Sequence, residues 1–298
     1  MLDDQRRESI ASASQNYRDV VLEQNLEALR YLVVAAEGEA EGLRKDDLPD
    51  EEIRDACLRL FSEQYGLISP DAGVATPASS LDDSVLPNTI KRCSLDGIDH
   101  GAVDVQKREA WFDAVHTAIA SLHVQPDDQD PHNAVAEHFR PLCLPADFQY
   151  LATLVRGVCG PGLPHYRETS QFSFIVDPEE AINDLEFYGT RNRVVVPARG
   201  RDVLAEAFHA LDMVWEDWQI AVGVKPGDGP RGWDGPWILY CRRIGDEGSL
   251  WGWRYGIREE IDYESELFDT IEDFLGFYAC YNEQKGDRLE AIPLEQVM

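Results

Sequence analysis

Histidines and carboxylates gather in the middle of the chain, where they could bind a metal ion. Four of the seven histidines lie between His116 and His138, and three aspartates lie among them. However, His116 and His123 are about two helical turns apart, roughly 10 Å along a helix axis, which is too far for both to reach one ion easily. The spacing is more typical of solvated or capping histidines. We therefore predict no metal site and no cofactor.

A glycine-rich segment, GVKPGDGPRGWDGPW, resembles a phosphate-binding loop in composition. Its lysine, Lys225, comes before the glycines, no Ser or Thr follows them, and the next element has the pattern of a strand. Phosphate loops lead instead into a helix N-terminus. We interpret the segment as a long hairpin loop, and loops on a rigid sheet often carry recognition. The candidate contact residues in it are Arg231, Trp233 and Asp234.

Common catalytic signatures are missing from the chain. It contains no GxSxG, HExxH or GxxxxGK[ST] motif, and no GxGxxG that opens a helix. These motifs mark many hydrolases, zinc peptidases and nucleotide-binding enzymes. We therefore predict no catalytic residues and expect that the chain is not an enzyme.

Aromatic rings are concentrated in PWILYCRRIGDEGSLWGWRYG, from Pro236 to Gly256. Because alternate residues of a strand share a face, Trp251, Trp253 and Tyr255 would point to one side. An apolar helix follows, so we expect these rings to line a core. On that expectation Trp253→Ala would cost about 3 to 5 kcal/mol of stability.

The opposite side of the same strand carries Arg254 between two glycines. Together with Arg242 on the preceding strand, it is expected to form an outward-facing basic strip. Side chains on such a strip are available to a partner, because the glycines beside them leave the backbone open to close approach. Arg242 and Arg254 therefore join the three loop residues as candidate binding residues.

Acidic residues dominate the composition and limit the classes of partner. The chain has 298 residues, 44% of them hydrophobic, and a formal net charge of -29. A field of this sign repels phosphate backbones and anionic lipid, so neither nucleic acid nor a membrane surface is an expected partner. It would speed the encounter with a basic protein, although acidity also serves solubility alone. A protein partner, basic in charge, is our expectation.

Cysteine usage and the N-terminus bear on the compartment. The six cysteines are scattered without a CxxC pair, a pattern typical of reduced thiols in the cytoplasm. The N-terminus lacks the basic start and apolar run of a signal peptide, and no window approaches the ~18 apolar residues of a membrane span. We predict a cytoplasmic location.

Residues 1–140 have helical periodicity and form the first predicted region. Apolar residues recur at helical spacing after Asp19, after Pro49 and from Val105 to about Val124. Between the second and third of these segments, the Pro-, Ser- and Asp-rich stretch near residues 67–88 predicts a flexible loop.

Residues 141–298 form the second predicted region. Pro145 begins a helix, and a helix capped by Asp269 or Thr270 comes near the end. Between them, apolar alternation predicts strands, the last three of which would form an antiparallel meander. These strands are Gln171 to Asp177, Arg193 to Ala198, Asp217 to Val224, Pro236 to Arg243 and Leu250 to Ile257. The predicted fold class is α+β, with an N-terminal helical region followed by a curved antiparallel sheet of about five to six strands flanked by helices.

The order of five segments in this second region resembles the SUKH superfamily, over roughly Pro141 to Gln284. The segments are LPADFQYL, EDWQIAVG, PWILYCRR, LWGWRYG and TIEDFLGFY. The superfamily includes the yeast cell-wall synthesis regulator and many bacterial toxin-immunity proteins. The resemblance implies a non-enzymatic domain that uses one face of a curved sheet and its loops to bind a protein partner.

Together these inferences predict a regulatory scaffold or a toxin-neutralising, immunity-like protein. Two alternatives stay open. The aromatic sheet face could bind carbohydrate or serve an uncharacterised enzyme, and the N-terminal helices could regulate the second region or mediate oligomerisation.

Overall fold

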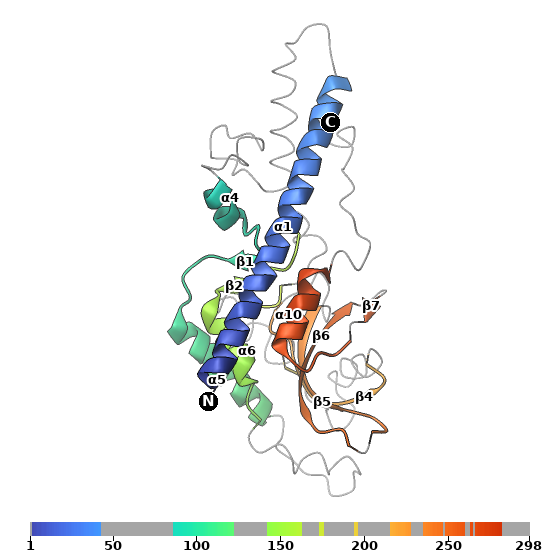
Figure 1. Cartoon of the computed structure of the whole chain (residues 1–298). Coiled ribbons are helices and arrows are strands. Elements are labelled where there is room, and N and C mark those ends of the chain that lie inside the picture. The colour runs from blue at the N-terminus through green and yellow to red at the C-terminus, as the bar shows by residue number, and fades with distance from the viewer. Residues whose placement is uncertain are drawn as a thin grey trace, which may run out of the picture. The chain divides into compact units, whose positions relative to one another are not determined.

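The computed structural model describes residues 2–42, 86–121, 142–162, 173–175, 194–195, 215–227, 235–246, 248–259, 263–264 and 266–281. Figure 1 shows the helices and strands along the chain. The described helices are α1 (Asp4–Gly42), α4 (Leu86–Cys93), α5 (Val105–Ser121), α6 (Ala146–Leu154) and α10 (Ile271–Ala279). Antiparallel strands lie between α6 and α10 in the sequence, so the fold class is α+β.

Two compact units divide the chain, and each is assembled from three segments. The first unit contains residues 1–14, 101–158 and 172–275, and the second contains residues 15–100, 159–171 and 276–298. The predicted boundary between residues 140 and 141 lies outside the described residues and stays a prediction. Most of the predicted loop near 67–88 lies outside them as well, but its end is helical, because α4 begins at Leu86.

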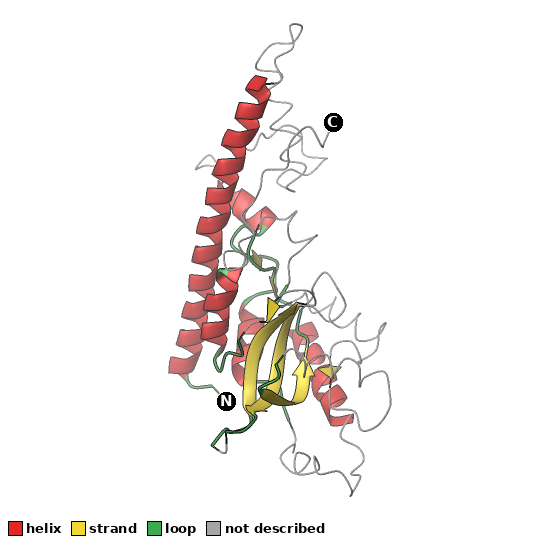
Figure 2. Ribbon diagram, turned by 90° about the vertical axis from the view of Figure 1, so that its right-hand side faces the viewer, coloured by secondary structure: helices red, strands yellow, loops and turns green. Residues whose placement is uncertain are grey.

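The sheet of the first unit is an antiparallel meander with the order β3-β4-β5-β6-β7 (Figure 2). Its long strands are β4 (Trp218–Val224), β5 (Gly235–Arg243) and β6 (Gly252–Glu259). The edge strands β3 (Val194–Val195) and β7 (Tyr263–Glu264) have two residues each. Two further two-residue strands, β1 (Ile98–Asp99) and β2 (Gly157–Val158), lie outside this sheet.

The predicted curved sheet of five to six strands matches the structure only in part: five strands pair in one antiparallel sheet, but β4, β5 and β6 make most of the pairing among the described residues. The segment predicted as a strand over residues 171–177 contributes an isolated bridge from Ile175 to Val158 among the described residues.

Both faces of the meander are packed along most of its length. On one face, Trp237, Leu239 and Cys241 form a core with Trp215 and Ile220, and all five side chains are nearly inaccessible. Leu239 has no exposed area, so this face is as dry as a protein interior.

The other face is covered by aromatic rings from several segments of the first unit. The Phe174 ring lies 4.7 Å from the Phe274 ring of α10 and 6.3 Å from the Tyr255 ring of β6. Phe148 of α6 reaches Phe174 at 5.7 Å and Trp111 of α5 at 6.0 Å, in edge-to-face contacts. These contacts fasten α5, α6 and α10 to one another around a shared aromatic core.

Helix α10 begins with the capping geometry that its sequence predicts. The Thr270 hydroxyl accepts the Asp273 N–H at 3.1 Å and donates to the Asp273 carboxylate at 2.6 Å. Thr270, rather than Asp269, is the cap. A capped start supports the short helix whose residues Ile271 and Phe274 are fully buried.

Helix α1 begins earlier than its apolar periodicity predicts. The prediction starts at Asp19, whereas the helix starts at Asp4, and the Arg6 N–H donates to the Asp3 carboxylate at 2.7 Å. A capping aspartate explains the early start, since it satisfies a backbone donor of the first turn. Polar residues on the first four turns hid this part of the helix from a search for apolar stripes.

The second unit has a small polar core of its own. The Asp96 carboxylate accepts from Arg18 Nε at 2.9 Å and lies 2.8 Å from His100 Nε2, with 3% of its side chain exposed. Tyr17 and Tyr278 stack with ring centroids 5.8 Å apart. Gly97 lies against this stack at φ +76, where an added Cβ would meet the Tyr17 hydroxyl at 2.8 Å.

Two tryptophans of the sheet differ in burial and give a matched test of the core. Trp237 is fully buried, whereas Trp253 is half-buried, so the expectation that Trp253 lies in the core is wrong. We expect Trp237→Ala to lower the free energy of unfolding by about 3 to 5 kcal/mol, as for other buried aromatics, and Trp253→Ala to lower it clearly less. Urea unfolding of the full chain measures both. Equal losses would contradict the assignment of the two faces.

Candidate functional site

The register between β5 and β6 decides which side chains share a face. Tyr240 is paired with Trp253, and Leu239 with Arg254. Because directly opposite residues point to the same side of a sheet, Trp253 lies with Tyr240 and Arg254 lies with the buried Leu239. Arg242 belongs to the face of Tyr240. The expected strip with Arg242 and Arg254 on one face is therefore wrong, since the two lie on opposite faces.

Four side chains form what we call the aromatic–arginine cluster: Tyr240, Arg242, Trp251 and Trp253. The Tyr240 ring stacks on the Trp251 ring at 5.7 Å, with 17° between their planes, and contacts the Trp253 ring at 5.4 Å. The Arg242 guanidinium lies 5.0 Å from the centroid of the Trp251 ring. Its Nε donates to Gln219 Oε1 of β4 at 2.8 Å, which fixes the guanidinium over the ring.

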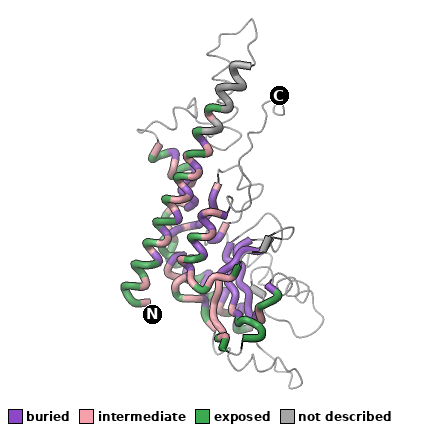
Figure 3. Tube along the Cα trace, turned by 45° about the vertical axis from the view of Figure 1, so that its right-hand side comes forward, coloured by how far each residue is buried: buried purple, intermediate pink, exposed green. Residues whose placement is uncertain are grey.

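This cluster is the accessible end of a mostly buried sheet. Arg242 is exposed and the three rings are half-buried. Figure 3 colours the Cα trace by burial and shows that the strands are mostly buried. Two large aliphatic residues of the adjoining hairpin are also exposed, Leu250 at 81% and Ile244 at 58%. Burial raises the pKa of Tyr240, so its hydroxyl stays protonated near neutral pH. Aliphatic, aromatic and cationic groups thus meet at one exposed place, which is typical of an interaction surface.

The hairpin that joins β5 to β6 is internally braced. The Arg243 N–H donates to Ser249 Oγ at 2.8 Å, and the Asp246 carboxylate accepts the Gly248 N–H at 3.0 Å. Gly245 has φ +77, a conformation that glycine adopts without strain. A braced turn holds Leu250 and Trp251 in place before a partner arrives, which lowers the entropy cost of binding.

On the opposite face, Arg254 has a structural environment. Its Nη1 donates to the Cys241 carbonyl at 2.7 Å, its Nε forms an ion pair with Asp269 at 2.7 Å, and its guanidinium lies 4.5 Å from the Trp218 ring. Only 13% of the side chain is exposed. Burial raises the pKa of the neighbouring Cys241 thiol to about 12, so this thiol stays protonated and unreactive near neutral pH.

The other predicted binding residues, Arg231, Trp233 and Asp234, lie outside the described residues. Of the five predicted positions, the structure therefore places Arg242 in the cluster and Arg254 on the buried face. The predicted binding role of each stays a prediction. Sequence reasoning missed Tyr240, Ile244 and Leu250, although the polar turn GDEGS could have indicated the exposed hairpin end.

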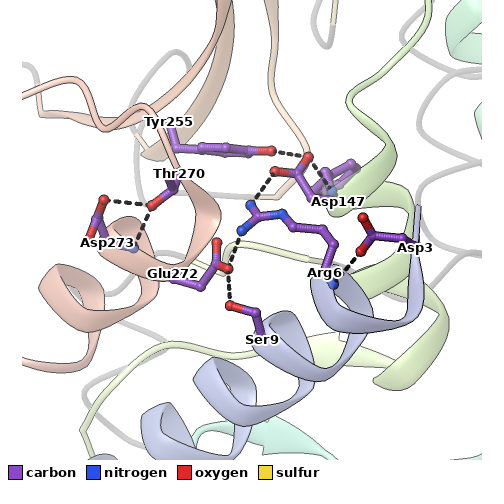
Figure 4. A network of polar contacts seen from close by, with 9 residues as sticks. Asp3, Arg6, Ser9, Asp147, Tyr255, Thr270, Glu272 and Asp273 are labelled. Carbon is purple, nitrogen blue, oxygen red and sulfur yellow. Dashed lines mark hydrogen bonds and ion pairs between the residues drawn. The ribbon is translucent and has the colours of Figure 1, made fainter. Parts of the chain in front are cut away.

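A second polar constellation joins four elements of the first unit (Figure 4). Arg6, near the start of α1, pairs with Glu272 of α10 and, at 3.2 Å, with Asp147 of α6. Ser9 Oγ donates to Glu272 at 2.6 Å, and the Tyr255 hydroxyl of β6 donates to Asp147 at 2.9 Å. One arginine thus bridges two carboxylates that come from distant parts of the sequence.

Electrostatics indicate that this constellation is a structural junction. Burial lowers the pKa of Arg6, but Glu272 and Asp147 outweigh burial and raise it overall. Burial and the Asp147 charge raise the pKa of Tyr255 well above its usual value. A charged arginine and a neutral tyrosine therefore hold both carboxylates across the ordinary pH range. Neither Arg6 nor Tyr255 has a pKa shifted toward neutral pH, as a general acid or base would have.

The histidine considered as a metal ligand has another partner. His116 Nε2 accepts the Leu144 backbone N–H at 3.1 Å, so α5 is tied to the segment before α6. Within the described part of the chain, no group of three or more His, Cys, Asp or Glu side chains is arranged to hold a metal ion.

Comparison with known proteins gives no relative: the chain matches no family model, no curated protein and no solved structure. Among the described residues, no helix has the length and apolar character needed to span a membrane.

Removing the bridging arginine tests the junction. We expect Arg6→Ala to lower the free energy of unfolding by about 1 to 3 kcal/mol, because it leaves Asp147 and Glu272 without their cation. This loss is smaller than that for a fully buried ion pair, since 32% of the Arg6 side chain is exposed. Arg30→Ala, at an exposed position of the same helix, is the control and should change stability by less than about 0.5 kcal/mol. Equal effects in urea unfolding would contradict the junction.

His116 makes stability depend on pH. Burial lowers its pKa in the folded chain, and the nearby Asp113 opposes this only in part. As the pH falls below about 6.5, the unfolded chain therefore takes up a proton that the folded chain resists, and stability is lost. We expect His116→Gln, which keeps an acceptor for the Leu144 N–H, to lose less stability than the parent between about pH 7.5 and 5.5. An identical loss in both proteins, measured by urea unfolding, would refute this role.

Proposed function

We propose that the chain is a non-enzymatic protein-binding module of SUKH type, and that it holds its partner at the aromatic–arginine cluster. The observation that carries this proposal is the half-exposed stack of Tyr240, Trp251 and Arg242 beside the exposed Leu250. Tyrosine, tryptophan and arginine are the residues most enriched where binding energy concentrates. The braced hairpin adds preorganisation, which favours affinity.

The order of elements supports the SUKH part of the proposal. α6, β4, β5, β6 and α10 follow one another with bounds close to the five segments on which the resemblance depends. A regulatory scaffold and a toxin-neutralising protein both use such a surface without catalysis. The scattered cysteines favour a cytoplasmic setting for either role.

Carbohydrate binding is the second candidate, and the half-buried Trp253 is the observation that favours it. Sugars stack on open aromatic faces. The Trp251 ring, however, is already stacked by Tyr240 and contacted by Arg242, so a sugar would have to displace an internal contact. A protein partner can instead bury the edges of these rings together with Leu250, without rearranging them.

Site-specific crosslinking tests the proposal. A photoreactive residue in place of Leu250 in the full chain should capture the partner, and Leu250→Ser and Trp251→Ala should each weaken its affinity by about tenfold or more, as truncation of an interface anchor does. The control is Val105→Ser, because Val105 is 51% exposed on α5 and distant in sequence from the hairpin.

Unchanged affinity in both hairpin variants would overturn the proposed surface. A titration with glucan oligosaccharides, followed by tryptophan fluorescence, tests the second candidate. The protein-binding proposal expects no change in fluorescence, whereas a saturable change that Trp253→Ala abolishes would favour carbohydrate.

A further inference from the structure

Two arginines at the end of β5 have no carboxylate partner within the part of the chain that the structure describes. Arg242 and Arg243 are both exposed, and neither forms an ion pair with a carboxylate of the described residues. Arg242 instead bonds the neutral side chain of Gln219. In contrast, Arg254 is paired with Asp269. These two exposed arginines thus lack an ion-pair partner among the described residues, in a chain whose net charge is -29.

Each of these arginines is held against a tryptophan. Arg242 lies 5.0 Å from the Trp251 ring, and Arg243 lies 5.5 Å from the Trp218 ring. Consecutive residues of a strand point to opposite faces, so the two stacks lie on the two sides of β5. A guanidinium positioned over a ring loses little freedom when it binds, and its planar donors match the two oxygens of a carboxylate.

The apolar part of the surface lies beside these charges. Leu250 and Ile244 are the exposed aliphatic residues of the hairpin, and each is within two residues of Arg242, Arg243 or Trp251 in the sequence. Arg242 and Arg243 lie on opposite sides of β5, so a ligand meets both only by wrapping around the end of this strand, and it must supply carboxylates for the arginines and apolar side chains for the hairpin.

We infer that the partner docks here through an acidic segment that carries aliphatic or aromatic side chains between its carboxylates. This inference rests on the proposed function and adds the chemistry of the contacting segment. The sign is opposite to that expected from the composition, which favours a basic partner. Charges farther away than about 8 Å are largely screened at physiological ionic strength, so the contact residues decide which charges are accepted.

Two synthetic peptides test the inference. They share the same leucines and one tryptophan, and they differ in carrying glutamate or lysine at every other position. Fluorescence anisotropy of the dye-labelled peptides, titrated with the full chain at physiological salt, should give an affinity for the glutamate peptide at least about tenfold higher than for the lysine peptide. Arg242→Glu combined with Arg243→Glu should reverse this preference.

Arg30→Glu combined with Lys91→Glu is the matched control, because it makes the same change of charge at exposed positions outside the hairpin and should leave the preference unchanged. Thermal unfolding of each variant verifies that the chain stays folded. Equal binding of both peptides, stronger binding of the lysine peptide or binding of neither overturns the inference.

Binding of the natural partner distinguishes failure of the acidic-segment inference from failure of the proposed function. If Leu250→Ser lowers the affinity for the captured partner while Arg242→Glu combined with Arg243→Glu does not, the inferred acidic segment is wrong and the proposed binding surface stands. If neither change affects the partner, both are wrong.

Discussion

The pairing of β5 with β6 is the constraint on which the rest of the first unit depends. With Tyr240 opposite Trp253, the fully buried Trp237 and Leu239 share their face with Gly256 and Arg254. A slip of one residue would reverse the facing of every side chain on one strand. It would place Trp253 under the core and Arg254 outside, which is the arrangement that composition alone suggests. Gly256, which has no side chain, is the residue paired with the buried Trp237 in this register.

The same register separates the stabilising part of the sheet from the part that can bind. Toward its middle, β6 contributes Tyr255, which is packed against Phe174 and Phe274 and hydrogen-bonded to Asp147. Toward the hairpin, the rings on this face are half-exposed. A rigid core therefore ends in an accessible edge made from the same strands. Such an edge can bind without deforming, because the contacts that fix it lie deeper in the sheet.

Local features of this fold were predictable from the sequence, whereas pairings between distant segments were not. The helix of Phe148 and Leu151 and the capped helix of Phe274 follow from apolar spacing and cap residues, and both occur where they were expected. The start of α1 at Asp4 was missed, because polar residues dominate its first four turns and the ion-pair partners of Arg6, Asp147 and Glu272, lie more than a hundred residues away in the sequence. The face of Arg254 was missed for a related reason. Alternation shows which residues of one strand share a face. The turn between two strands sets their register, and the register decides which residues of the neighbouring strand lie on that same face.

Arginine environments distinguish stabilisation from binding in this acidic chain. Acids outnumber bases 56 to 27, so a carboxylate is seldom far from any cation. Arg6 and Arg254 both make such ion pairs, and both are largely withdrawn from solvent. Arg242 and Arg243 are exposed, stacked on tryptophans and without a described carboxylate partner. An exposed arginine contributes little to stability, even when it is paired. Their ordered placement beside Leu250 is therefore better explained by what the hairpin binds than by what the fold requires.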